Sequence, residues 1–175
     1  MSYGARLIFT KKSGLQINVE AVIQDAPTRV SDGYVSGTGP IGGYSNSELN
    51  DWMENTLMGY FPSNLLSAIK QVNKYTTTYD TSGAKVNNVV SAHYLWAPSA
   101  REVGINNYET EGPSYAILYP DNNSRKKSPS GLSFAEAWWL RTGYSAAHVA
   151  FVYNGGGLND YYAESNYYLA PGFCL

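Results

Sequence analysis

The chain has 175 residues, of which 43% are hydrophobic and 15% charged, and its formal net charge at pH 7 is −2. This length is sufficient for one domain with a substantial core. The small net charge excludes the strong positive field typical of nucleic-acid-binding proteins, and no window approaches the ~20 apolar residues of a membrane span. The N-terminus also lacks the apolar core of a signal peptide. We therefore expect a globular domain with no nucleic-acid partner and no membrane insertion.

Polarity is carried by Asn, Ser, Thr, Gly and 16 tyrosines rather than by charged residues. A tyrosine combines a large apolar ring with a hydrogen-bonding tip, which suits a recognition surface, but aromatic residues are also enriched in strands. We expect roughly half of the tyrosines to be structural. The single cysteine, Cys174, can form no internal disulfide, so stability must come from the core, and we expect this thiol to be buried.

The first forty-odd residues predict β structure and turns. Apolar and polar residues alternate from 15 to 21, which is the period of a half-buried strand. Five glycines and a proline within residues 31–44 indicate a long loop or a linker. We therefore assign residues 1–44 to an N-terminal β/loop extension and residues 45–175 to the main domain.

Two helices are predicted next. The first begins after a cap at Ser45 or Ser47 and ends at Gly59, with apolar residues at helical spacing between them. The second opens at Pro62. Its apolar face consists of Leu65, Leu66, Ile69 and Val72.

Strands are predicted over most of the remaining chain, because β-branched, aromatic and buried apolar runs recur there. The predicted strands cover residues 75–79, 89–96, 138–141, 149–152, from Leu158 onward, and 169–175. Turns are predicted at Asp80–Gly83 and Asn154–Gly157. In the last strand alternate residues from Leu169 to Leu175 are apolar, and Pro171 places it at a sheet edge.

Between these strands the chain predicts one short helix and one long loop. Ser99 and Glu102 have the spacing of a capping box, so a helix should start there and end near Gly104. Residues 105–131 show no clear period and predict a loop of a length that is uncommon and often functional.

Residues with catalytic or metal-binding chemistry are few and scattered. His93 and His148 are far apart with no metal-binding spacing, and Cys174 has apolar neighbours that disfavour its thiolate. Asn159-Asp160 with Glu164 offers three oxygen side chains, whereas Ca²⁺ takes six to eight oxygen ligands. We therefore expect no enzyme activity, no metal and no cofactor.

Three charged groups are interpreted as solvated surface or loop. These groups are Glu48 with Asp51, Glu109 with Glu111, and the basic run Arg125–Lys127.

Residues 159–168 have the composition of a recognition surface. They include four tyrosines, two asparagines, a serine and two acidic residues directly after a glycine turn. Aromatic faces with amide and hydroxyl tips suit sugars and protein epitopes alike. An ordinary tyrosine-rich strand pair is the alternative interpretation. The residues expected to join this surface across the hairpin are Tyr144, Ser145, His148, Tyr153 and Asn154.

Several motifs occur in a fixed order along residues 45–175. They are Ser47–Met53, Leu66–Ile69, Leu95–Val103, Trp138–Thr142, Ala150–Val152 with the glycine turn, and Tyr167–Leu175. This order resembles a bacterial and phage family with S-x-L-x-x-W-L-N and s-A-I helices and a strand ending in L-L-S-x-x-E-V. The same family ends in W-W-L-R-S/T, then a-y-V-n-x-x-G, then y-G-V-R-P-A. Two features depart from related patterns: Ala170 stands where the family has the arginine of G-V-R-P, and the reactive cysteine pair of formylglycine-generating enzymes is missing.

The resemblance implies a C-type-lectin-like fold, as used by formylglycine-generating enzymes and by the variable proteins of diversity-generating retroelements. We therefore expect an α+β domain with two helices packed on a small twisted antiparallel sheet with long loops. In the variable proteins the ligand surface lies between the W-x-L-R strand and the final strand. Together with the composition of residues 159–168, this predicts the ligand-binding residues Tyr144, His148, Tyr153, Asn159, Tyr161, Tyr162, Glu164 and Asn166. The predicted scaffold residues are Trp138, Trp139, Leu140, Val152, Leu169, Pro171 and Phe173.

These expectations indicate a non-enzymatic domain of a phage tail or surface protein used in host attachment. It would bind a host cell-surface protein or glycan from the virion or an extracellular surface. The alternative is a structural virion or surface-assembly protein that uses the same fold for packing. Residues 1–44 lie outside the resemblance, and we expect them to join the sheet or to mediate assembly into a larger particle or a homo-oligomer such as a trimer. A ligand-binding face stays open in the assembled particle, whereas an assembly face is buried.

Overall fold

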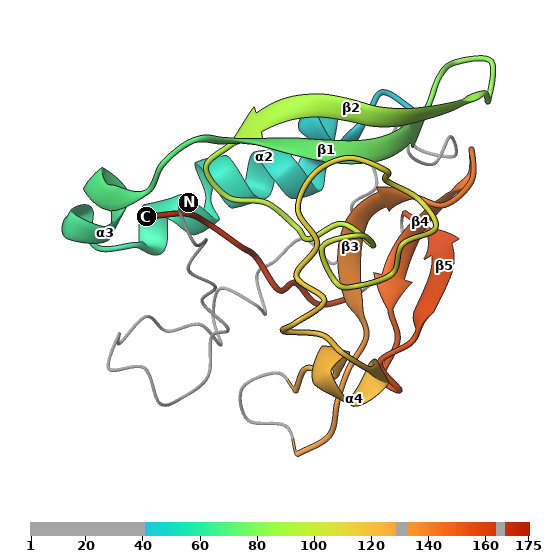
Figure 1. Cartoon of the computed structure of the whole chain (residues 1–175). Helices are drawn as coiled ribbons and strands as arrows, with labels where there is room; N and C mark the ends of the chain where they lie inside the picture. Colours follow the sequence, from blue (N-terminus) through green and yellow to red (C-terminus); the bar gives the residue numbers. More distant parts are fainter. Residues whose placement is uncertain (1–40, 129–132, 164–166) are drawn as a thin grey trace.

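The computed structural model describes residues 41–128, 133–163 and 167–175. The predicted N-terminal extension, residues 1–44, therefore lies almost entirely outside the described residues. The described chain is an α+β fold in which short helices accompany two small antiparallel sheets (Figure 1). Across these residues, no helix combines the length and the apolar character needed to cross a bilayer.

Two short α-helices lead the described chain, α2 at Glu48–Asn55 and α3 at Ser63–Ala68. The 3₁₀ helices are Tyr44–Asn46 and Leu57–Tyr60. Ser47 caps α2, because its Oγ accepts the backbone N–H of Asn50 at 3.0 Å. The cap is therefore the second of the two predicted serines.

The second helix is shorter than predicted. Its apolar face was expected to reach Val72, but α3 ends at Ala68 and Ile69 already has an extended backbone with ψ of 129°. Val72 instead begins a strand. The reason is that the β-branched and aromatic residues after it pair with a second strand, and this tertiary pairing outweighs a helical period.

The first sheet is a hairpin of β1 (Val72–Tyr79) and β2 (Lys85–His93). Its first strand and its turn are confirmed, and Gly83 in the turn takes a φ of 80° that favours glycine. The second strand begins and ends earlier than the predicted range 89–96. Trp96 contributes only an isolated bridge, to Gly172.

The second sheet contains β3 (Trp138–Gly143), β4 (His148–Val152) and β5 (Leu158–Tyr162), in the order β3-β4-β5. All three predicted strands and the glycine turn after β4 are confirmed. Gly156 in that turn has a φ of +85°, and a Cβ there would lie 1.7 Å from the carbonyl oxygen of Asn122. Only glycine fits so close to another backbone, which explains one of the three consecutive glycines.

The C-terminal segment forms no regular strand, contrary to the prediction for residues 169–175. It makes isolated bridges instead, from Gly172 to Trp96 and from Cys174 to Lys70. Figure 1 shows it running from the second sheet back toward α3. Cys174 is buried as predicted, but Leu175 is exposed, so the expected alternation of buried residues fails at the chain end.

The predicted helix at Ser99 is a single turn. Both capping-box bonds are present: the Ser99 N–H donates to Glu102 Oε2 at 3.0 Å, and the Glu102 N–H donates to Ser99 Oγ at 3.2 Å. Gly104, with a φ of +79°, then reverses the chain, and the N–H of Ile105 bonds back to Ala100. The predicted capping box is therefore confirmed, but Gly104, with its left-handed backbone, ends the helix after one turn.

The long loop predicted at 105–131 contains one further short helix, α4 (Asn122–Arg125), capped by Asp121. Arg125, predicted to be solvated, is buried: its Nε donates to the carbonyl oxygen of Gly156 at 2.9 Å, and its NH1 to that of Val103 at 3.2 Å. The prediction that Arg125 is solvated was wrong, because backbone carbonyls of three separate segments accept its hydrogen bonds, those of Gly156, Val103 and Tyr119. Their spacing in the sequence does not reveal this.

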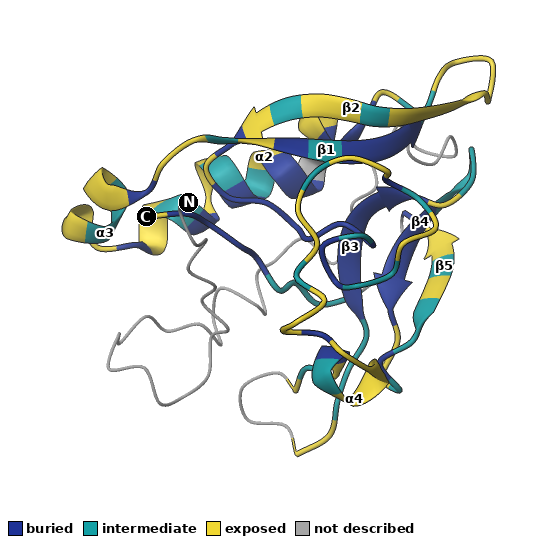
Figure 2. Cartoon of the chain, in the orientation of Figure 1, coloured by how far each residue is buried: buried dark blue, intermediate teal, exposed yellow. Residues whose placement is uncertain are grey.

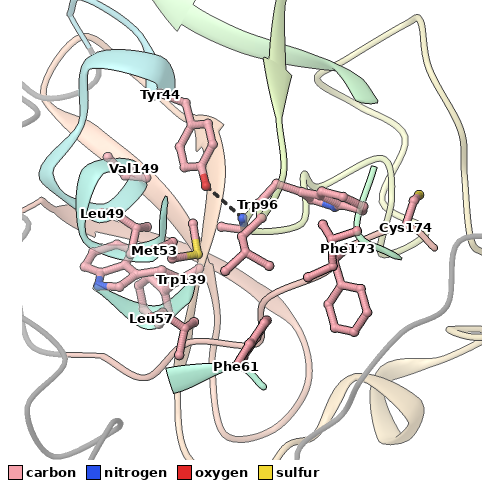
Figure 3. Packing of buried hydrophobic residues seen from close by; sticks show 14 of the residues in the cluster. Tyr44, Leu49, Met53, Leu57, Phe61, Trp96, Trp139, Val149, Phe173 and Cys174 are labelled. Carbon is pink, nitrogen blue, oxygen red and sulfur yellow. Dashed lines mark hydrogen bonds between the residues drawn. The ribbon is translucent and has the colours of Figure 1, made fainter. Parts of the chain in front are cut away.

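β3 and β4 are buried on both faces, so the core has two clusters separated by this sheet (Figure 2). The first cluster joins Trp139, Val149 and Phe151 to α2 and to Phe173 of the C-terminal segment (Figure 3). In the second cluster the opposite face of the sheet packs against the Ser99 turn and the long loop. Its buried members are Ala100, Val103, Tyr119, Trp138, Leu140, Ala150 and Val152. The predicted scaffold residues are accordingly buried, except Leu169, which is half-buried.

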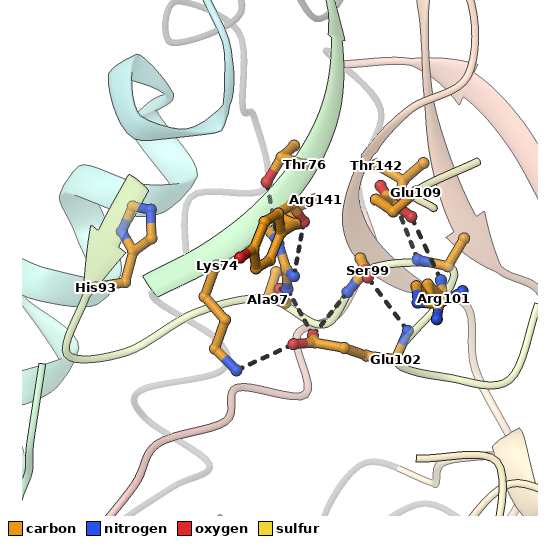
Figure 4. Close-up of polar contacts among 12 residues, drawn as sticks. Lys74, Thr76, His93, Ala97, Ser99, Arg101, Glu102, Glu109, Arg141 and Thr142 are labelled. Carbon is orange, nitrogen blue, oxygen red and sulfur yellow. Dashed lines mark hydrogen bonds and ion pairs between the residues drawn. The ribbon is translucent and has the colours of Figure 1, made fainter. Parts of the chain in front are cut away.

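A network of buried charges connects the two sheets (Figure 4). Glu102 accepts from Arg141 NH1 at 2.6 Å through one oxygen and from Lys74 Nζ at 3.0 Å through the other. Arg141 also donates to the carbonyl oxygens of Ala97 at 2.7 Å and Tyr75 at 3.0 Å. Burial alone would raise the pKa of Glu102, but the two adjoining cations outweigh it and hold that pKa below its ordinary value.

A second buried carboxylate lies beside this network. Glu109 was predicted to be solvated, yet it is fully buried, accepting from the Thr77 N–H at 3.1 Å and from Thr142 Oγ1 at 2.7 Å. The carboxylate is thus tied to β1 and β3 at once. The hydrogen-bond partners of Glu109 are far away in the sequence. Its local sequence context, which is polar, therefore predicted a surface position.

We expect Glu102→Gln to lower the free energy of unfolding by about 3–5 kcal/mol, because it leaves two buried cations without their shared partner. Urea denaturation of the variant measures this loss. Glu111→Gln, at an exposed glutamate, is the matched control and should change stability by less than about 0.5 kcal/mol. Equal denaturation midpoints for the two variants would contradict a structural role of the network.

We expect Trp139→Ala to cost about 3–5 kcal/mol of stability, since the indole is buried against Phe151 and Tyr167 with ring centroids 5.9 and 4.8 Å away. Trp52→Ala, at a half-buried indole on α2, should cost clearly less in the same thermal or chemical denaturation assay. A Trp139→Ala protein as stable as the parent would argue against this core.

His93 should make the stability depend on pH. Burial, with Arg141 and Lys74 nearby, lowers its pKa from 6.5 to about 4. The unfolded chain therefore takes up the proton at a higher pH than the folded chain, so this contribution is complete above pH 6.5 and is lost as the pH falls toward 4. We expect the free energy of unfolding to drop by about 2 kcal/mol across this window.

The matched variant for this test is His93→Gln, which should show a smaller drop over the same pH range in urea denaturation. Glu54, 3.3 Å from His93 Nδ1, acts in the opposite sense, because burial raises the pKa of its carboxyl. Parallel stability curves for the variant and the parent would show that His93 is not the group responsible.

Candidate ligand-binding surface

β5 is one of the two edge strands of the three-stranded sheet and carries most of the exposed side chains of that sheet (Figure 2). Tyr161 is 50% exposed and Tyr162 is 48% exposed, and Asn159 is exposed as well. β3, by contrast, is buried along its whole length. The predicted recognition residues on β5 thus lie in solvent on a strand that is supported by a rigid, doubly covered sheet.

His148, at the start of β4, lies directly across from Tyr162 in the register of the sheet. Its Nδ1 is 2.6 Å from Asp160 Oδ2, and both side chains are half-buried. The imidazole is nearly parallel to the Tyr161 ring at a centroid distance of 6.4 Å, and perpendicular to the Tyr162 ring at 4.5 Å. The two tyrosine rings are themselves perpendicular, with centroids 5.6 Å apart. These four residues form one contact group.

The exposed Tyr144 joins this group from the turn between β3 and β4. Its backbone N–H donates to the His148 carbonyl at 3.0 Å, and its own carbonyl accepts the Tyr79 hydroxyl at 2.8 Å. The ring packs against Tyr108 of the long loop, with centroids 5.6 Å apart. We refer to these residues together as the aromatic corner. Its members are Tyr108, Tyr144, His148, Asp160, Tyr161 and Tyr162.

Tyr108 was missed by sequence reasoning. It lies in a loop whose apolar residues show no regular spacing. The length of that loop was the one feature of the sequence that indicated a functional role. Burial raises the pKa of its phenol far above the ordinary range, and Tyr144 and Asp160 add to the shift. Lys85 of β2 lies 5.5 Å from the centre of its ring. The first sheet and the long loop therefore both contribute to a surface that was predicted from the last forty residues alone.

Not all the predicted site residues come together. Tyr153 is exposed but lies at the opposite end of β4, five residues from His148, which is about 17 Å along a strand. Asn159 faces solvent between these two ends. Glu164 and Asn166 lie outside the described residues.

The four tyrosines of residues 159–168 divide evenly between surface and structure. Tyr161 and Tyr162 are exposed, whereas Tyr167 stacks on Phe151 at a centroid distance of 4.3 Å and Tyr168 packs against the second core cluster. Two of these four rings are therefore available at the surface, and the other two are packed against neighbouring residues.

The aromatic corner has the chemistry of a contact surface. It offers apolar ring faces, phenol hydroxyls and one imidazole–carboxylate pair, so it can stack on a ligand and exchange hydrogen bonds with it. Asp160 is already engaged by His148. Within the described ranges, His, Cys, Asp and Glu side chains do not gather in the groups of three that a metal site needs.

Comparison with known proteins gives one match. The family described as "Domain of unknown function (DUF6273)" matches residues 34–175. No curated protein and no solved structure matches the chain. The matched range includes both sheets, the long loop and the aromatic corner.

Proposed function

This chain belongs to the DUF6273 family, and we propose that it is a non-enzymatic binding domain with a C-type-lectin-like fold. Its aromatic corner would contact a host cell-surface protein or glycan. The parent molecule would be a phage tail protein or another surface protein used in host attachment, acting from a virion or an extracellular surface.

The observation that carries this proposal is the placement of Tyr161 and Tyr162. Two large rings are held about half exposed and perpendicular to each other on an edge strand, beside a polar His148–Asp160 pair. Exposed tyrosines supply contact area at a low entropic cost and a hydroxyl for hydrogen bonding. Because the sheet beneath is buried on both faces, little order has to be gained when a ligand binds.

The positions of the charged residues favour binding over catalysis. Glu102 and Glu109 are carboxylates of the kind that serve as general acids or bases, but both are fully buried. Glu102 is bonded to Arg141, and Glu109 is bonded to Thr142 and to the Thr77 backbone. A substrate would have to open the core to reach them. The aromatic corner offers mainly phenols, which bind well and are weak acid–base catalysts at neutral pH, together with the half-buried His148–Asp160 pair.

The proposed C-type-lectin-like fold is supported by the way two motifs meet. The arginine of the W-W-L-R run is Arg141, and the glutamate of the S-x-x-E-V run is Glu102, which lies 2.6 Å from it. The short helices, the small antiparallel sheets and the long loop are also compatible with the arrangement that the resemblance implies.

A second candidate function is structural assembly, and a different surface favours it. Ile117 is 92% exposed and its neighbour Leu118 is also exposed, on the long loop. Adjacent apolar side chains in solvent are typical of surfaces that become buried in an oligomer. A stable homo-oligomer such as a trimer that loses its affinity in an Ile117→Ser variant would favour this alternative.

The test is binding of the labelled protein to a panel of bacterial cells and to their isolated surface polysaccharides. We expect Tyr161→Ala combined with Tyr162→Ala to abolish selective binding while changing stability by less than about 1 kcal/mol, because both rings are half in solvent. Tyr60→Ala, at an equally exposed tyrosine after α2, is the matched control and should bind like the parent.

Each outcome has a clear meaning. Loss of binding only in the double variant would locate the ligand face at the aromatic corner. A large drop in melting temperature of the double variant would place the rings in the core instead. Absence of binding to every cell and polysaccharide, together with a stable oligomer in solution, would reject host attachment in favour of assembly.

A further inference from the structure

Tyr153 directly follows β4, and its ring lies across the glycine turn. A Cβ at Gly155 would collide with Cε2 on one edge of the ring, and a Cβ at Gly157 would collide with Cε1 on the other edge. The ring therefore occupies the space that side chains at both positions would need. The close approach of Gly156 to the Asn122 backbone explains one of the three consecutive glycines, and the ring of Tyr153 explains the other two.

The turn beneath this ring is fixed by contacts with the rest of the fold. The Gly156 N–H donates to the Tyr153 carbonyl at 2.7 Å, and the Gly156 carbonyl accepts from Nε of the buried Arg125 at 2.9 Å. Tyr153 is nevertheless 40% exposed. A ring that is both positioned and open to solvent suits ligand binding, because little side-chain freedom remains to be lost when a ligand binds.

The ring of Tyr153 is in line with two exposed side chains of β5. The Tyr153 N–H donates to the Gly157 carbonyl at 3.0 Å, so Tyr153 lies opposite Gly157 and its ring takes the place of a side chain there. Alternate side chains leave a strand on the same side, and positions 157, 159 and 161 alternate. Tyr153, Asn159 and Tyr161 therefore form one row, which we call the outer row. It extends about 13 Å, the length of four strand residues.

The outer row has the chemistry of a sugar-binding surface. Its two tyrosines are 40% and 50% exposed, and the exposed amide of Asn159 lies between them. Asn159 Oδ1 accepts the backbone N–H of Asp160 at 2.9 Å, which fixes the amide, and Nδ2 is a donor for a ligand hydroxyl. The carboxylate of Asp160 leaves β5 on the other side, toward His148. A row without a charged side chain suits an uncharged partner.

We propose that the outer row binds an uncharged polysaccharide, whose sugar rings stack on Tyr153 and Tyr161 and whose hydroxyls bond to Asn159 between them. Two platforms this far apart cannot both contact one small sugar, whereas consecutive units of an extended chain reach both. This inference rests on the proposed function of host attachment and narrows the partner from a protein or a glycan to a glycan. The outer row meets the aromatic corner at Tyr161, which belongs to both.

The first test compares binding of the labelled protein to bacterial cells treated with protease, with periodate or with neither. Protease removes exposed protein, whereas periodate cleaves the vicinal diols of sugars. We expect binding to survive protease and to be lost after periodate. Binding that survives periodate and is lost after protease would overturn the inference of a glycan and leave host attachment standing. Absence of binding to every untreated cell would reject both.

The second test uses the uncharged polysaccharide purified from a cell that the protein binds, cut into fragments from disaccharides to octasaccharides. We expect the affinity to rise with fragment length until a fragment spans the outer row. Tyr153→Ala should bind the longest fragments about five- to tenfold more weakly, because one stacked ring is lost. Tyr94→Ala, at a tyrosine that follows β2 and is also 40% exposed, is the matched control and should bind like the parent. Equal affinities of the parent for disaccharides and octasaccharides would overturn the proposal.

Gly155→Ala separates the position of the Tyr153 ring from its presence. Gly155 does not have the left-handed backbone of Gly156, so the backbone accepts alanine while the new Cβ displaces the ring. We expect this variant to unfold near the urea concentration of the parent and yet to bind the longest fragments about as weakly as Tyr153→Ala. Parent-like affinity in Gly155→Ala would show that the ring only covers the turn and would overturn the proposal.

Discussion

Three charged side chains are buried together in the core, namely Arg141, Glu102 and Lys74. Most of the remaining structure has to keep these three charges paired. Moving a single charge of this kind into a core costs several kcal/mol unless a partner neutralises it. The partners come from β1, the Ser99 turn and β3, and Glu102 and Arg141 are 39 residues apart in sequence. The two sheets and the turn between them can therefore only become buried as one unit.

The candidate ligand surface follows from that condition. The buried Arg141 lies on β3, and both faces of β3 and β4 are covered. One face packs against α2 and the C-terminal segment, and the other packs against the long loop. β5 forms the edge of the sheet opposite β3, and its two tyrosines remain exposed there. The exposed rings are thus carried by a strand that pairs with the deeply buried β4.

Local patterns were reliable wherever a residue's environment depends on its immediate neighbours in sequence. The apolar run at Trp138–Leu140, the glycine turn after Val152 and the Ser99–Glu102 capping bonds all appear as predicted. Predictions failed where distant residues supply the partner. Glu109 and Arg125 were predicted to be solvated, but each is buried because backbone and hydroxyl groups from remote segments satisfy its hydrogen bonds.

The sequence by itself determined most of the strands, the turns between them and the segment that is richest in tyrosine, since these depend on side-chain period and local backbone preference. Only the tertiary structure decided that Tyr161 and Tyr162 are exposed while Tyr167 and Tyr168 are packed, and that Tyr108 joins the same corner. Burial depends on which segments close over a residue. That is a property of chain packing over long sequence separations, and neighbouring residues do not encode it.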